Sequence, residues 1–113
     1  MLRSLLLLST LFFTIANAYV LRGWTKKNRE GRLVLSVDNS INSGTYCHNV
    51  DRGYENTISS FVFTATPLCT AKFMSQRDCH GDRLGRSTGG WWKDELSAEA
   101  DNKIDSVEVT CII

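Results

Sequence analysis

Short runs of β-branched and aromatic residues recur along the chain, and turn-forming residues separate them. Five such runs are predicted as strands, at residues 33–37, 45–50, 60–65, 68–73 and 106–111. In two of them apolar and polar residues alternate, so that Phe61 and Phe63, like Val107 and Val109, fall on one face. Strands this short, with a turn about every 8 to 12 residues, are typical of an all-β sandwich. One stretch, residues 93–100 (KDELSAEA), is helical in its local composition and predicts about two surface turns.

The first 18 residues follow a different pattern. Arg3 is followed by an apolar run from Leu5 to Ile15 and then by Ala16-Asn17-Ala18. This is typical of a secretory signal peptide that is cleaved after Ala18, and the run is too short for a membrane span. Residues 19–113 are therefore expected to be a single secreted, extracellular domain with no membrane span. A domain of this size is marginally stable without cross-links.

The charges of the exported part exclude some partners. Arg3 accounts for the one surplus positive charge, so the mature chain is formally neutral. Neutrality argues against a nucleic-acid partner and against a cationic membrane-lytic peptide. The charges are unevenly placed, since residues 22–32 are mostly basic and residues 94–108 mostly acidic. Two solvated faces and a basic docking patch on the first hairpin both fit this distribution.

Four cysteines belong to the exported part, at Cys47, Cys69, Cys79 and Cys111. An even number in a small secreted chain predicts two disulfides. Each would stabilise the fold by about 2–4 kcal/mol, which a domain of this size needs. The cysteines alone allow three pairings.

A weak internal repeat runs through the exported part. Trp24 to Gly31 and Phe73 to Gly81 each begin with an aromatic residue, continue as a polar hairpin turn and end in glycine. Later in each half the pattern acid-Asn-x-Ile-x-Ser appears, at residues 55–60 and 101–106. Two copies of a four-strand unit would make eight strands, enough for two packed sheets.

This repeat resembles a βγ-crystallin domain, and the resemblance covers nearly all of residues 19–113. The family has two Greek-key motifs that form a sandwich of two four-stranded antiparallel sheets. Its hairpin carries two aromatic residues and a glycine. Arg29 stands at the second aromatic position of the first hairpin and Cys79 at that of the second, which has one extra residue. The signal-bearing, cysteine-containing form is most similar to microbial killer toxins, secreted metalloprotease inhibitors and small secreted fungal effectors.

The resemblance also implies which cysteines pair. In a Greek key the first and last strands of a motif are antiparallel neighbours, which brings Cys69 close to Cys111. The third strand of the first motif crosses to the sheet of the second motif, where Cys47 can reach the hairpin that holds Cys79. The expected disulfides are therefore Cys69–Cys111 and Cys47–Cys79.

In the family the Asn-rich motif binds calcium, a hard cation that takes six to eight oxygen ligands. The resemblance implies two weak sites of three residues each, completed from the other loop: Asn56, the Thr57 carbonyl and Ser59 in one, and Asn102, the Lys103 carbonyl and Asp105 in the other. Glu55 departs from the usual Asn or Asp, and Lys103 adds a cation. The alternative is that the polar side chains of the two motifs only form hydrogen bonds within their own loops as turn formers: Asn56, Ser59, Ser60, Asn102 and Ser106. No cofactor is expected to be required.

Trp91 and Trp92 follow two glycines. Neighbouring residues of a strand face opposite sides, so if this segment is a strand, one Trp is expected in the core and the other on the surface as a binding anchor. The alternative to a binding anchor is a Trp that only covers the end of the sandwich.

No catalytic residues are expected. The side-chain types of a small ribonuclease are present in His48, His80, Glu55 and Arg77, but no spacing ties them together. We therefore expect a monomeric, non-enzymatic binding protein that acts outside the producing cell, as an effector or toxin-like protein, on an unidentified target on or in another cell. An inhibitor of a secreted protease, with residues 38–44 as bait loop, is the alternative, and a small extracellular ribonuclease is a third hypothesis.

Overall fold

The computed structural model describes residues 19–39, 43–65, 68–93, 96–97 and 100–112, and the predicted signal peptide lies outside these ranges. The described chain forms eight strands: β1 (Tyr19–Trp24), β2 (Leu33–Asn39), β3 (Gly44–Asn49), β4 (Ser60–Ala65), β5 (Cys69–Met74), β6 (Arg83–Thr88), β7 (Trp91–Lys93) and β8 (Ser106–Cys111). Two short 3-10 turns, η2 (Lys27–Arg29) and η3 (Arg77–Cys79), follow β1 and β5.

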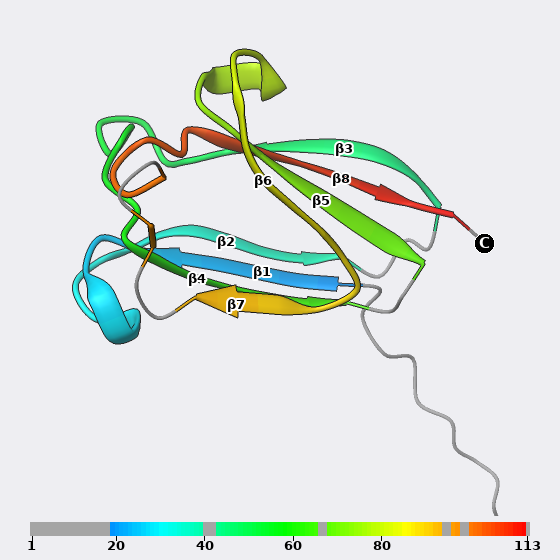
Figure 1. Ribbon diagram of the computed structural model, residues 1–113, viewed down its shortest axis with the longest axis horizontal. Helices are drawn as coiled ribbons and strands as arrows, with labels where there is room; N and C mark the ends of the chain where they lie inside the picture. Colours follow the sequence, from blue (N-terminus) through cyan, green and yellow to red (C-terminus); the bar gives the residue numbers. More distant parts are fainter. Residues whose placement is uncertain (1–18, 40–42, 66–67, 94–95, 98–99, 113) are drawn as a thin grey trace, which may run out of the picture.

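The strands form two antiparallel sheets of four, in the orders β2-β1-β4-β7 and β3-β8-β5-β6 (Figure 1). In each half of the chain the fourth strand pairs with the first, as β4 with β1 and β8 with β5. The third strand of each half joins the other sheet, because β3 pairs with β8 and β7 pairs with β4. The two halves therefore interlock, and neither sheet is built from one half alone.

Three strands were missing from the sequence prediction, and each is missing for a physical reason. β1 follows the predicted cleavage point directly, and Arg22 and Gly23 interrupt its β-rich composition. β6 lies at a sheet edge and carries Arg83, Gly85 and Arg86, so it lacks a β-rich composition. β7 has only three residues.

The helix predicted at residues 93–100 is wrong wherever the structure describes that stretch. Lys93 ends β7, and Leu96 and Ser97 are not helical; residues 94–95 and 98–99 lie outside the described ranges. The Leu96 N–H donates to the Ser59 carbonyl, and Leu96 and Ala100 are buried against the core. These tertiary contacts outweigh the weak local helix preference.

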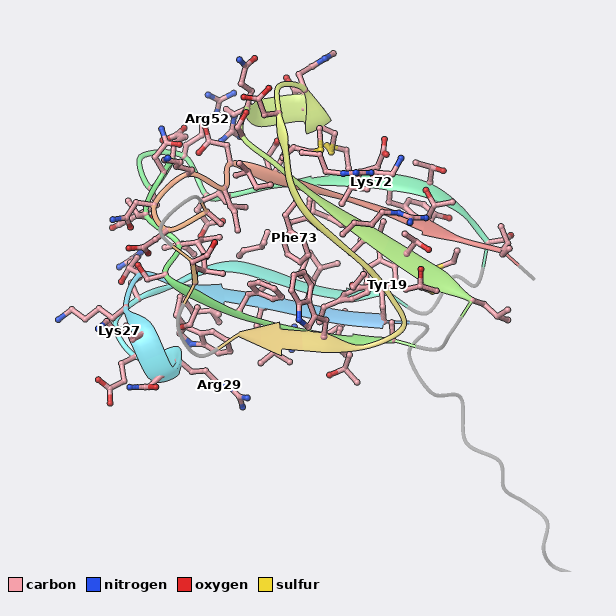
Figure 2. All side chains as sticks on the ribbon, viewed as in Figure 1. Tyr19, Lys27, Arg29, Arg52, Lys72 and Phe73 are labelled. Carbon is pink, nitrogen blue, oxygen red and sulfur yellow. A yellow bond between two sulfur atoms is a disulfide. The ribbon has the colours of Figure 1, made fainter. Side chains whose placement is uncertain are left out.

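The core lies between the two sheets. Leu21, Phe61 and Phe63 of one sheet face Phe73 and other buried residues of the second sheet, and Figure 2 shows Tyr19 and Phe73 in this layer. The ring centroids of Phe61 and Phe73 are 4.4 Å apart, so the two sheets are in direct aromatic contact. A fully buried side chain of this size contributes about 1.5–3 kcal/mol to folding.

Two disulfides cross-link the β3-β8-β5-β6 sheet and the hairpin after β5, and they join the pairs implied by the resemblance. Cys69 and Cys111 face each other in the register of β5 and β8, and both are buried. Cys47 of β3 is bonded to Cys79 of η3. The first bond anchors the last strand, and the second joins the first half of the chain to the hairpin of the second.

The two folded hairpins have the same geometry, which corrects the register of the repeat. The Thr25 N–H donates to the Arg32 carbonyl in the first hairpin, and the Ser75 N–H donates to the Asp82 carbonyl in the second. This register makes Met74 the counterpart of Trp24, so the second hairpin contains no extra residue. Phe73 is a core residue and does not open that hairpin.

Candidate functional site

The two Asn-containing loops, residues 55–60 and 101–106, lie side by side ahead of β4 and β8. The Asn102 N–H donates to the Ile58 carbonyl at 3.0 Å, which joins one loop to the other. Asn56 and Asn102 both have left-handed backbone conformations, with φ of 60° and 59°. Asn tolerates this conformation better than most residues, so the sequence favours the same bend in each loop.

A cluster of three side-chain oxygens forms where Ser59 of the first loop meets the start of the second. The Ser59 hydroxyl donates to Asp101 Oδ1 at 2.6 Å and lies 3.2 Å from Asn102 Oδ1. Ser59 thus contacts the other loop, from which the predicted site was to be completed, and its joint use with Asn56 as a calcium ligand stays a prediction. Asp101 was not among the predicted ligands. Its position as the acidic first residue of the repeated motif is the sequence feature that could have indicated it.

The second cluster, around Asp105, is built differently. Asp105 Oδ1 accepts a hydrogen bond from the Asn56 N–H at 2.7 Å, and the residue is only 7% exposed. Glu55 does not join it: one carboxylate oxygen accepts from the Gly53 N–H and the other lies 3.2 Å from Arg77 Nη1. A hydrogen bond from its own backbone N–H, assisted by the Gly53 N–H and the charge of Arg77, lowers the pKa of Glu55.

These contacts decide which cluster can hold a cation. At Ser59, Asp101 and Asn102, oxygens from two loops converge and one carries a negative charge, which is the ligand chemistry of calcium. At Asp105 one carboxylate oxygen accepts a backbone N–H and the residue is buried, and Arg77 neutralises Glu55. The residue set therefore fits a cation at the first cluster and fits it poorly at the second.

Two of the predicted calcium residues contribute no side chain to these clusters. The Thr57 hydroxyl donates to the Tyr54 carbonyl, within its own turn. Lys103 is exposed, and its N–H donates to the Ala100 carbonyl at 3.1 Å. Only their backbone carbonyls were proposed as ligands.

The last serine of each loop has a structural role in the hairpins. The Ser60 hydroxyl donates to the Lys26 carbonyl at 2.6 Å and accepts from the Arg29 N–H at 3.0 Å. In the second half, Ser106 likewise donates to the Gln76 carbonyl and accepts from the Cys79 N–H. Both serines are fully buried, so each locks a folded hairpin onto the fourth strand of its motif. Their hydrogen bonds leave their own loops, contrary to the turn-former alternative.

Trp91 lies on the core side of β7. Its ring meets those of Phe61 and Phe73 edge-on, with centroids 5.2 and 5.8 Å away. Trp91 is therefore not the exposed anchor. The backbone of Trp92 pairs with Val62, and its side chain is not described.

The residues considered for ribonuclease chemistry are engaged in separate structural contacts. His48 Nε2 lies 2.6 Å from the Tyr19 hydroxyl, and burial lowers the pKa of His48. Arg77 donates to the Val50 carbonyl as well as to Glu55. His80 is exposed on the second hairpin.

Two other surfaces raised by the sequence are only partly described. The bait loop of the protease-inhibitor hypothesis comprises residues 38–44. Residues 40–42 lie outside the described ranges, and Asp38 forms an ion pair with Arg22 at 2.7 Å. In the first hairpin Lys27 and Arg29 are exposed and point away from the sheets (Figure 2). Arg22 of β1 is engaged in the ion pair, and a basic docking patch on the hairpin stays a prediction.

Comparison with solved structures identifies the architecture. A βγ-crystallin domain from Clostridium beijerinckii superposes with a TM-score of 0.53 at 14% identity, covering 80% of this chain and 97% of that chain. A βγ-crystallin domain from Flavobacterium johnsoniae gives 0.52 at 17% identity, covering 81% and 94%. The fold is βγ-crystallin-like. A clostrillin double mutant in complex with nickel is also similar to this chain, with a TM-score of 0.53 at 13% identity.

The sequence matches no family model and no curated protein at a significant level. Within the described part of this βγ-crystallin-like chain, no three His, Cys, Asp or Glu side chains gather in a way that could hold a metal ion. The oxygen cluster at Ser59 differs from such a group, because an alcohol and an amide supply two of its three atoms. The same described residues include no helix that is long and apolar enough to cross a membrane.

Proposed function

We propose that the chain is exported and that residues 19–113 form a binding domain that acts, as an effector or toxin-like protein, on a target on or in another cell. The observation that carries this proposal is that both cysteine pairs are joined, Cys47 to Cys79 and Cys69 to Cys111. Disulfides form and persist mainly in oxidising compartments such as the cell exterior. The signal peptide predicted at residues 1–18 would bring the chain there.

The strand order supports a finer description of the domain as two Greek-key motifs. In each half the fourth strand returns to lie beside the first, which in turn pairs with the second. The third strand passes to the opposite sheet, as β3 and β7 do. This is a Greek-key connection shared between two layers.

Binding is favoured over catalysis by how the titratable side chains are used. His48 is turned toward Tyr19, and Glu55 and Arg77 neutralise each other at the protein surface. A general acid or base must reach the proton it transfers, and these groups are already engaged. We therefore propose that recognition by the surface, without turnover, is the activity.

We further propose that Ser59, Asp101 and Asn102 hold calcium weakly at the junction of the two loops. The ion would neutralise Asp101 and link the loops, and the remaining ligands would be carbonyls and water. Extracellular calcium modules bind with dissociation constants of about 0.1–1 mM, so such a site would be filled outside the cell.

The experiment is to apply purified, disulfide-bonded protein, residues 19–113, to competing microbes and to host tissue. A dose-dependent effect is expected from the native protein, and none from the same protein after reduction and alkylation. RNA, peptide and polysaccharide substrates are expected to stay intact. Mutation-sensitive turnover of any of them would contradict the proposal, and potent inhibition of one enzyme in a protease panel would favour the inhibitor hypothesis.

A further inference from the structure

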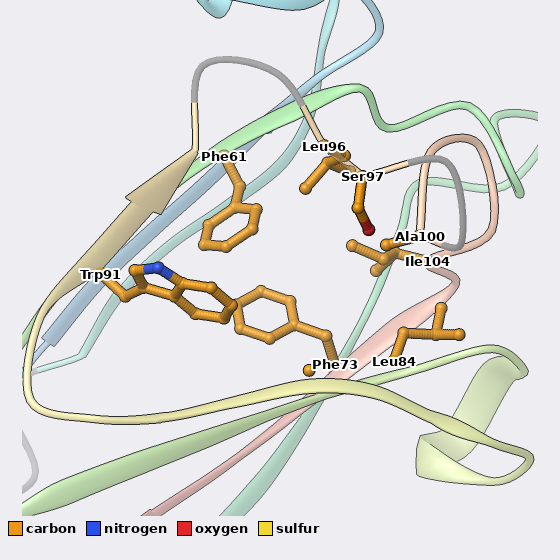
Figure 3. A pocket seen from close by; sticks show the side chains of 9 residues that line it. Phe61, Phe73, Leu84, Trp91, Leu96, Ser97, Ala100 and Ile104 are labelled. Atoms are coloured by element: carbon orange, nitrogen blue, oxygen red, sulfur yellow. The ribbon is translucent and has the colours of Figure 1, made fainter.

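An apolar cavity opens at the flank where the edge of one sheet meets the edge of the other, beside β6 and β7. Phe61, Phe73 and Ile104 form its buried floor, while Leu84 and Trp91 are only partly buried and lie at its rim. Figure 3 shows these side chains around an open centre, with Ser97 beside Leu96 on the side opposite Trp91. The cavity volume is about 80 Å³, within a hollow of about 370 Å³ that includes its open mouth.

The lining defines the chemistry of a ligand. Apart from Ser97, the described residues that line the cavity are apolar, and none of them is charged. Three aromatic rings meet there, with Trp91 edge-on to Phe61 at 78° and to Phe73 at 79°. Aromatic rings favour edge-to-face and offset contacts with a further ring. The exposed hydroxyl of Ser97 provides one hydrogen-bonding group at the mouth.

Its size limits the ligand to one ring. An apolar cavity of about 150 Å³ stays dry and takes up benzene. Here the whole cavity measures about 80 Å³, roughly half of that, so a ring can be only partly enclosed and its substituent lies at the open mouth near Ser97. Gly85 forms part of the wall without a side chain, and a Cβ at that position would lie 3.4 Å from the Trp91 ring.

The geometry points to this cavity as a binding site for a small neutral molecule with a single aromatic ring and one hydroxyl group, of which phenol is the simplest. The site lies inside the sandwich flank and is distinct from the oxygen cluster of the two loops.

The test is calorimetric titration of the disulfide-bonded domain with phenol, in a chelator so that the loops stay calcium-free. Saturable one-site binding is expected, with cyclohexanol binding at least about fivefold more weakly because it has the same size without an aromatic face. Ala100→Leu, which adds bulk inside the cavity, should weaken phenol binding at least about tenfold. Thr64→Leu, a comparable enlargement at an exposed position of β4, should leave the affinity within about twofold.

Two further measurements keep the result decisive if Ala100→Leu does not fold. Gly85→Ala places one methyl at an ordinary contact distance from Trp91 and should also weaken phenol binding. In the wild-type protein, NMR cross-peaks are expected between phenol and the rings of Phe73 and Trp91. Absence of saturable phenol binding, equal binding of phenol and cyclohexanol, or cross-peaks to other residues would each overturn the proposal.

Discussion

The hydroxyl of Ser59 donates a hydrogen bond to Asp101 across the junction of two loops that are 42 residues apart in the sequence. In the repeat Asp105 takes the place of Ser59 and Glu55 that of Asp101, but Asp105 Oδ1 instead accepts from the Asn56 N–H. The two loops are thus similar in conformation and different in chemistry. The asymmetry arises from Glu55, which pairs with Arg77, whereas Asp101 stays with the serine.

Calcium is expected to stabilise the domain through the Ser59 cluster. A ligand that binds only the native state raises its stability by about 2.7 kcal/mol when present at about 100 times its Kd. Melting curves in 10 mM calcium and in chelator should therefore differ for the wild type and coincide for Asp101→Asn. Asp105→Asn is the matched control: it should lower the Tm in both buffers and keep the calcium-induced rise. A rise that survives Asp101→Asn and disappears in Asp105→Asn would assign the ion to the other cluster.

Ser106→Ala is expected to destabilise the domain by about 1–3 kcal/mol. The substitution leaves the Cys79 N–H and the Gln76 carbonyl without their buried partner, and unpaired buried polar groups cost about this much. Chemical denaturation measures the loss, and Ser60→Ala should give a similar value because its two hydrogen bonds are equivalent. Ser36→Ala, at an exposed position, should stay within about 0.5 kcal/mol of wild type. Equal effects at positions 36 and 106 would contradict the structural role.

Stability is expected to fall as the pH drops below about 6.5. Burial lowers the pKa of His48 in the folded state, so the unfolded chain binds a proton there first, starting near its ordinary pKa of 6.5. The contribution of His48 is therefore present above that pH and is lost as the pH falls toward the folded-state value. Urea denaturation at pH 7.5 and 5.0 measures the change. His48→Gln should flatten this pH dependence of stability. His80→Gln, at an exposed position, should leave it unchanged. If His80→Gln flattens the dependence and His48→Gln does not, His48 is not the group responsible.

Loss of the buried disulfide is expected to cost more than loss of the outer one. Removing a native disulfide from a small secreted domain costs about 2–5 kcal/mol. Cys69 and Cys111 are buried and anchor the last strand, so Cys69→Ala with Cys111→Ala also leaves a cavity. After Cys47→Ala with Cys79→Ala, η3 keeps the reciprocal hydrogen bonds between Asn49 and Asp78. Denaturation midpoints compare the two variants, and a larger loss for the outer pair would refute this ranking.

The parts of the fold that the sequence predicted are those that depend on local patterning. Strands with alternating apolar residues, such as those of Phe61 and Val107, were identified because one face is buried. β6 and β7 were missed because β6 carries few apolar residues and β7 has only three residues, whereas β2 and β3, which are also edge strands, were predicted from their β-rich composition. The hairpin register was misplaced by one residue because Met74 stands where the first half has Trp24, and the aromatic Phe73 next to it belongs to the core.

The sequence indicated where the two loops of the candidate site lie in the chain, but not which of their side chains contact each other. The repeated acid-Asn-x-Ile-x-Ser pattern marks both loops, yet only the folded chain shows that Ser59 meets the opposite loop. Arg77 lies 22 residues from Glu55, so its neutralising contact has no local signature in the sequence. The inward orientation of Trp91 likewise depends on its pairing with Phe63, which a two-residue pattern cannot specify.

Non-reducing peptide mapping of the protein that the producing cells release into their medium tests whether the domain is exported and disulfide-stabilised. The released chain is expected to begin at Tyr19, with one peptide pair joined through Cys47 and Cys79 and another through Cys69 and Cys111. A protein that stays inside the cells, begins at Met1 and carries free thiols at these positions would contradict this expectation.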